Sequence, residues 1–81
     1  MRKEEYFRTE WKSNLGSRAI DASGLEFYYP DHPISYGAEY WYLGYEKGIQ
    51  YDPKDVADWW RESLQTKEQY LGLQNQKQSS I

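Results

Sequence analysis

The chain has no cysteine, and its 81 residues include one histidine and one methionine. The lack of cysteine excludes disulfide bonds, thiolate zinc sites and cysteine nucleophiles. Secreted chains of this length usually depend on disulfide bonds for stability. We therefore expect an intracellular, cytoplasmic protein.

Long apolar runs are also missing from the sequence. No segment approaches the ~20 apolar residues of a membrane-spanning helix, and the polar start is unlike a signal peptide. Hydrophobic residues make up 38% of the chain, which is below the average for globular domains. A chain of this length forms one domain at most and buries about 60–65% of its extended surface. We expect one small core and no association with a membrane.

Aromatic residues are abundant, at 19% of the chain. Eleven of the fifteen lie between Phe27 and Trp60, and seven of those eleven are tyrosines. A disordered chain would have few aromatic residues. Each tyrosine combines an apolar ring with a hydroxyl group that needs a partner or water. So many hydroxyl groups predict that several tyrosines lie at the surface, where they suit contact with another macromolecule.

Two segments have the pattern of helices that flank the chain's centre. Phe7, Trp11 and Leu15 recur every four residues and predict a helix over residues 3–15, which Gly16 ends. The tryptophans are expected in the core.

The clearest local signal is Asp52-Pro53-Lys54-Asp55. Asp52 is an N-cap residue, Pro53 fits the first helical position, and Asp55 suits the positive end of the helix dipole. This signal predicts a helix that begins at Pro53, runs to about residue 71 and ends at Gly72.

A third helix is predicted between these two, from Ser35 to Gly48. Tyr36, Tyr40 and Leu43 form an apolar stripe along it, and Gly44 inside it implies the close approach of another helix or a bulky ring. Before it, residues 25–29 alternate as a short strand would, but a lone strand has nothing to pair with. We therefore expect an extended segment that crosses the helices.

These elements predict an all-α fold. It is a small three-helix domain over residues 1–72, with an irregular aromatic-rich connection between helices 1 and 2. The glutamine- and serine-rich residues 73–81 are predicted to form a flexible tail.

The aromatic centre of the chain is also its acidic part. Residues 25–60 hold two basic and seven acidic side chains. An acidic surface repels phosphate groups and disfavours nucleic-acid binding, whereas it suits a basic patch on a protein. The alternative is that the acidic residues only keep an aromatic-rich surface soluble.

No arrangement in the sequence predicts catalysis. The single histidine, His32, lies between two prolines without a motif that would supply partners. Asp52, Asp55 and Asp58 recur every three residues but lack the glycine and glutamate of a calcium loop. We expect no enzyme activity, no metal and no cofactor.

One short segment resembles a known family. Gly44-Tyr45-Glu46-Lys47-Gly48-Ile49, followed by Trp60-Arg61-Glu62, is similar at about nine positions to the ribosome modulation factor family. The resemblance implies a small helical protein bound to ribosomal RNA. That family is strongly basic and has a longer spacing between the two parts, whereas this segment is acidic, so the chain is not assigned to it.

The sequence therefore predicts a small non-catalytic protein-binding module. It would act as an adaptor, inhibitor or regulatory subunit, as viral and accessory proteins often do, and would dock on a larger protein. The predicted anchors are Tyr28, Tyr29, Tyr42 and Tyr51, and the acidic residues predicted to steer a basic partner are Asp31, Glu46 and Asp52. Two alternatives stay open: a ribosome- or nucleic-acid-associated regulatory factor, and a homo-oligomer that buries its tyrosine surfaces.

Overall fold

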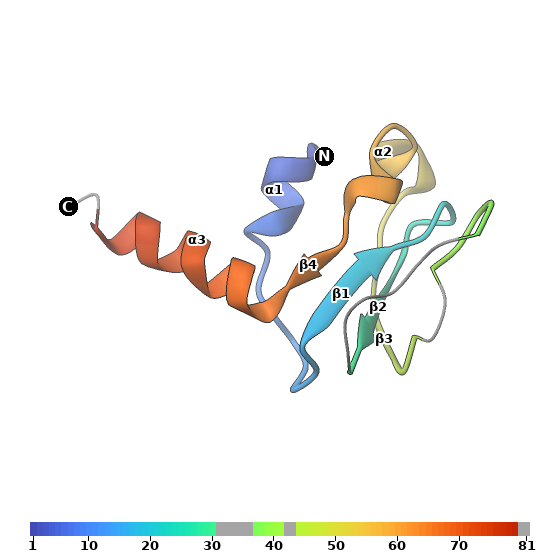
Figure 1. The fold of residues 1–81 in the computed structure, drawn as a ribbon. Helices are drawn as coiled ribbons and strands as arrows, with labels where there is room; N and C mark the ends of the chain where they lie inside the picture. Colours follow the sequence, from blue (N-terminus) through green and yellow to red (C-terminus); the bar gives the residue numbers. More distant parts are fainter. Residues whose placement is uncertain (31–36, 42–43, 80–81) are drawn as a thin grey trace.

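The fold contains an antiparallel sheet, so the prediction of an all-α domain is wrong. The computed structural model describes residues 1–30, 37–41 and 44–79. Within them, four strands form one sheet in the order β3-β2-β1-β4. The strands are β1 (Ser17–Ile20), β2 (Leu25–Tyr29), β3 (Glu46–Gln50) and β4 (Gln65–Thr66), and the helical elements are α1 (Lys3–Phe7), α2 (Pro53–Val56), the 3-10 turn η1 (Trp60–Glu62) and α3 (Lys67–Ser79) (Figure 1).

The alternation in residues 25–29 does mark a strand, and its partner is β1. The two strands form a hairpin in which Arg18 pairs with Tyr28 and Ala19 pairs with Phe27. The turn closes through a hydrogen bond from Gly24 N to Asp21 O, at 2.9 Å, with Gly24 at a φ of 87° that favours glycine. The partner strand escapes prediction because its sequence is Ser-Arg-Ala-Ile, with a charged side chain inside it.

All three predicted helices differ from the observed ones. The first ends at Phe7, not at residue 15. The second is absent, because residues 37–41 are not helical and residues 46–50 form β3, although residues 35, 36, 42 and 43 lie outside the described part. The residues that resemble a helical family therefore lie partly in a strand.

The third predicted helix is divided into separate elements. Asp52 does cap α2, since its Oδ1 accepts a hydrogen bond from Lys54 N at 2.9 Å, but that helix ends at Val56. α3 then begins after Thr66 and passes through Gly72, so the predicted end at Gly72 is wrong. Thr66 and Gln69 form a capping box: Gln69 N donates to Thr66 Oγ1, and Thr66 N donates to Gln69 Oε1. The flexibility predicted for residues 73–81 stays a prediction.

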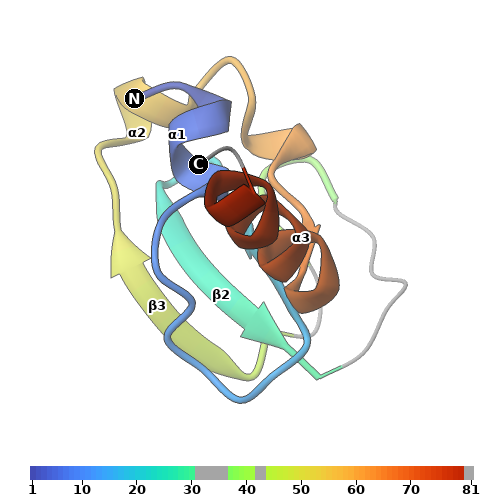
Figure 2. The same ribbon diagram turned by 90° about the vertical axis from the view of Figure 1, so that its left-hand side faces the viewer.

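The two faces of the sheet are covered by different parts of the chain. Figure 2 shows α1, α3 and the segment after α1 in front of one face. The other face carries Ala19 and Phe27, and Gly44 packs against the Phe27 ring. α3 projects from the body (Figure 1), which gives the molecule extents of 41 × 26 × 18 Å. The buried core cluster comprises Tyr6, Ala19, Ile20, Tyr29, Trp41, Val56 and Trp60.

A buried arginine joins the sheet to its covering layer. Arg18 has no exposed surface. Its Nε and Nη2 donate to Gln65 Oε1 at 2.9 and 2.7 Å, and its Nη1 lies 3.7 Å from Glu26 Oε2. The same guanidinium donates to the carbonyl oxygens of Glu10 and Thr9, at 3.2 and 3.1 Å. Every strand but β3 is thereby tied to the segment that follows α1.

Aromatic rings surround the rest of the guanidinium. Its central carbon lies 4.8 Å from the ring centroid of Tyr6, 4.7 Å from that of Trp11 and 5.4 Å from that of Tyr70. A cation desolvated among ring faces is stabilised by their quadrupoles. The Tyr6 hydroxyl group also donates to Glu26 Oε2 at 2.8 Å, so the Glu26 carboxylate and the Arg18 guanidinium belong to one buried network.

Arg18→Ala should lower the free energy of unfolding by about 3–5 kcal/mol, because the buried carboxylate of Glu26 loses its cation. Urea unfolding followed by circular dichroism measures this. Arg2→Ala is the control, since the Arg2 side chain is 81% exposed and its loss should change stability by less than about 0.5 kcal/mol. If the two variants were equally stable, the network would not hold the fold together.

The pairing of β2 with β3 contains a bulge in β3, at Gly48 and Ile49, opposite Glu26. Leu25 pairs with Gln50 and Phe27 with Lys47, so two steps along β2 match three along β3. The Glu26 carboxylate fills the space over Gly48 and accepts a hydrogen bond from Ile49 N at 3.3 Å. A Cβ atom on Gly48 would overlap that carboxylate.

Gly48→Ala should therefore destabilise the protein by about 1–3 kcal/mol, as overpacking of a filled site does. Gly72→Ala is the matched control, because nothing lies within 4 Å of the added Cβ in α3, and alanine should stabilise that helix by up to about 1 kcal/mol. The urea midpoint should fall for Gly48→Ala and rise for Gly72→Ala. Shifts of the same sign in both variants would contradict the bulge geometry.

Candidate functional site

The two adjacent tyrosines of β2 are buried, so their predicted exposure is wrong. Tyr28 is 1% exposed and Tyr29 is 0% exposed. The Tyr28 hydroxyl accepts a hydrogen bond from Lys12 N at 3.0 Å, and its ring meets Trp11 edge to face. The Tyr29 hydroxyl has no hydrogen-bond partner among the described residues. Burial raises the pKa of Tyr29, and the nearby Asp21 carboxylate raises it further.

The other predicted contact residues do not form one surface with them. Tyr51 is partly buried, with its ring 5.7 Å from that of Tyr6 and perpendicular to it. Glu46 and Asp52 are exposed, but Glu46 accepts a hydrogen bond from Ser13 Oγ at 2.7 Å, and Asp52 caps α2. Asp31, Tyr42 and His32 lie outside the described residues.

Among the described residues, two tyrosines that were predicted to lie within a helix are exposed. Tyr45 is 72% exposed and Tyr40 is 51% exposed. Tyr45 directly precedes β3 and is fixed at its backbone, where its N donates to Tyr28 O at 2.9 Å. β3 is an edge strand of the sheet, and four of its five residues are exposed. Two described tyrosines therefore lie at the surface, and neither is one of the predicted anchors.

A hollow beside Tyr45 brings aromatic side chains and a carboxylate together. Its volume is about 270 Å³, and its lining residues are Asp21, Phe27, Tyr40, Trp41 and Gly44. Phe27 belongs to β2, Asp21 begins the hairpin turn, and the other three come from the segment that covers this face of the sheet. Gly44 lies so close to the Phe27 ring that an added Cβ would stand 2.9 Å from it. The bulky ring that the sequence analysis expected near Gly44 is thus Phe27.

Hydrogen bonds fix the walls of this hollow. Trp41 N donates to Asp21 Oδ1 at 2.7 Å, and Trp41 Nε1 donates to Ile20 O at 3.0 Å. Arg61 Nη2 donates to Ala38 O at 2.9 Å and anchors the start of the covering segment to η1. Among the described residues, no donor reaches the second carboxylate oxygen of Asp21. Burial raises the pKa of Asp21, and the hydrogen bond from Trp41 opposes that rise.

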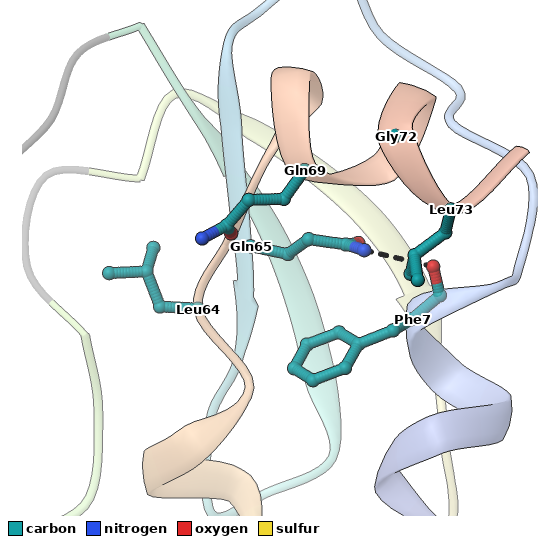
Figure 3. A pocket seen from close by; sticks show the side chains of 6 residues that line it. All are labelled: Phe7, Leu64, Gln65, Gln69, Gly72 and Leu73. Carbon is teal, nitrogen blue, oxygen red and sulfur yellow. Dashed lines mark hydrogen bonds between the residues drawn. The ribbon is translucent and has the colours of Figure 1, made fainter. Parts of the chain in front are cut away.

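A larger hollow lies between α1, β4 and α3 (Figure 3). It has a volume of about 390 Å³ and is lined by Phe7, Leu64, Gln65, Gln69, Gly72 and Leu73. The Gln65 amide already donates to Phe7 O at 2.9 Å and accepts from Arg18, and Gln69 belongs to the capping box. Its polar groups are therefore used within the fold, and the hollow offers a ligand little except apolar surface.

The buried network offers no accessible chemistry. Burial raises the pKa of Tyr6 well above its ordinary value, with the Glu26 carboxylate as the second cause. Both side chains are at most 1% exposed, so no substrate reaches them. In the part of the chain that the structure describes, no three metal-ligating side chains gather, and no helix has the length and apolar character needed to span a membrane.

Comparisons of the chain with protein-family models, with curated proteins and with solved structures found no match. The function is therefore argued from the residues of the chain itself.

Asp21→Asn should remove a pH dependence of stability. The pKa of Asp21 in the folded protein lies above its ordinary value of 3.8. The contribution of this residue to stability is therefore greatest at or below that pH, and it is lost as the pH rises through the pKa of the folded protein. The variant does not titrate, so its stability relative to wild type should increase between pH 3.8 and about pH 7. Urea unfolding across this range measures the difference.

Asp58→Asn is the control, because Asp58 is an exposed residue. This variant removes an exposed carboxylate and leaves the hollow intact. An equal slope for both variants would mean that the hollow does not desolvate Asp21.

Proposed function

We propose that this chain is a small non-catalytic module that docks on a larger protein carrying a basic patch. The observation that carries the proposal is Tyr45, which is 72% exposed at the start of the edge strand β3. A large ring held out on a rigid element loses little conformational freedom on binding, and such residues dominate the energy of interfaces. Tyr40, on the rim of the adjacent hollow, supplies a second ring.

Docking through side chains fits this edge better than pairing of strands. β3 exposes its outer edge, as a strand that accepts a partner strand does. However, the bulge at Gly48 and the exposed Lys47 are features that hinder pairing between edges. The edge therefore serves as a rigid base for Tyr45, and the proposal assigns the binding energy to the tyrosine rings.

The charges in the stretch of chain that carries these rings favour a basic partner. Between residues 37 and 58 five acidic and two basic side chains occur, and all seven residues are exposed. The acidic residues are Glu39, Glu46, Asp52, Asp55 and Asp58. Such a potential speeds the encounter with a positive surface and repels phosphate groups. The module would act by occlusion or bridging, as an adaptor, inhibitor or regulatory subunit, and the lack of cysteine supports a cytoplasmic location.

Replacement of both exposed tyrosines should abolish docking. In a pull-down with the tagged full chain from extracts of its native cell, Tyr40→Ala/Tyr45→Ala should retain the partner at least about tenfold less than wild type, since one interface anchor contributes about 2 kcal/mol or more. Leu71→Ala is the matched control. Leu71 is 49% exposed, close to the 51% of Tyr40, and lies on the projecting helix α3.

Three outcomes would contradict the proposal. The double variant could retain the partner as well as wild type does, or the captured material could be ribosomes that nuclease treatment releases. Alternatively, light scattering across a concentration series could show that the exposed tyrosines join copies of this chain.

A further inference from the structure

We propose that the hollow lined by Asp21, Phe27, Tyr40, Trp41 and Gly44 binds the side-chain ammonium group of a lysine on the partner protein. The inference rests on the proposed function, and it names the group that the docking surface recognises. The hollow adjoins that surface directly, since Gly44 precedes Tyr45 in the chain and Tyr40 is common to both.

The lining has the composition of a cation site. Three of the five lining residues are aromatic and one is an acid. Ring faces attract an ammonium group, most strongly where water is excluded. Asp21 is 7% exposed, so its charge acts through a medium of low polarity, where attraction to a cation is stronger than in water. The alkyl stem of a lysine would lie against the rings while its charged end meets the carboxylate.

The carboxylate geometry favours lysine over arginine. Trp41 N donates to Asp21 Oδ1 at 2.7 Å, and no donor from the described residues reaches the second oxygen, where a ligand could bind. A guanidinium group binds carboxylates best through two parallel hydrogen bonds to both oxygens. An ammonium group is a compact point charge and needs only one oxygen. A volume of about 270 Å³ admits either side chain, so the preference for lysine rests on the carboxylate.

The larger hollow provides an internal comparison. It is lined by Phe7, Leu64 and Leu73 among others, and no described residue that lines it carries a carboxylate. An apolar probe should prefer it, whereas a cationic probe should prefer the hollow at Asp21. Both hollows are open apolar depressions in the same molecule. The preference of a probe for one hollow over the other therefore measures the effect of the Asp21 carboxylate.

The test is a titration of the ¹⁵N-labelled full chain, followed by amide and indole chemical shifts. The probes are n-butylammonium, which reproduces the lysine side chain, n-propylguanidinium, which reproduces that of arginine, and neutral 1-butanol. We expect n-butylammonium to shift the signals of Trp41 and Gly44, to bind at least about tenfold more tightly than 1-butanol, and to bind more tightly than n-propylguanidinium.

Variants then assign the effect to named groups. Asp21→Asn should weaken n-butylammonium binding by about tenfold or more, since it removes a charge-assisted hydrogen bond. Tyr40→Ala, at an exposed position that does not threaten folding, should weaken it by roughly two- to fivefold. Glu68→Gln, an exposed acid of α3 outside the hollow and outside the docking surface, should leave it within about twofold of wild type.

Several results would overturn the inference. They are equal affinity for 1-butanol, tighter binding of n-propylguanidinium, shifts confined to Phe7 and Leu73, or an Asp21→Asn variant that binds like wild type. None of these needs the partner protein. If the probes do not bind but the pull-down still depends on the two tyrosines, only the lysine assignment is wrong. If the probes bind but no partner is captured, the proposed function is wrong.

Discussion

The fold depends on a charge placed where charges are rarely tolerated. Arg18 lies in the second strand from the edge with no exposed surface, and a cation in such a place requires hydrogen bonds and an anion. Glu26 supplies the anion, and Gln65 and the carbonyl oxygens after α1 supply the acceptors. This requirement explains why α1 is so short. The carbonyl groups that would continue the helix turn towards the guanidinium, so the chain leaves the helix at Phe7 and wraps the sheet instead.

That arrangement decides where a ligand can bind. The face of the sheet that carries Arg18 is closed by α1, the segment after it and α3 (Figure 2). The opposite face is covered by irregular chain, in which rings stand at intervals and Gly44 brings the backbone against Phe27. The hollow at Asp21 lies on that face, opposite to the one that the buried arginine occupies.

The sequence predicts local signals of this fold well and its long-range pairings poorly. The cap at Asp52, the alternation in residues 25–29 and the ring near Gly44 are all visible in it, because each is set by neighbours in the chain or by a missing side chain. The partner of β2 is not visible, since Arg18 has the chemistry of a surface residue and only the folded chain supplies Glu26 and Gln65. The burial of Tyr28 was missed for the same reason. Lys12 N, which is distant in the chain, satisfies the hydroxyl of Tyr28, as Glu26 satisfies that of Tyr6, so a surplus of phenols predicts that some are exposed but not which.

Two carboxylates at the β1–β2 hairpin show how structural and binding acids differ. Glu26 is saturated: it accepts hydrogen bonds from Tyr6 and Ile49 N and faces Arg18, so a further cation would gain nothing there. Asp21 is also largely buried, but among the described residues it receives one hydrogen bond, from Trp41 N, and its side chain lines a hollow. Burial of a charge with so little compensation lowers stability at neutral pH. A cation that enters the hollow would supply the missing compensation, and the free energy recovered would appear as binding affinity. The same physics that makes Arg18 indispensable to the fold therefore makes Asp21 suited to a ligand.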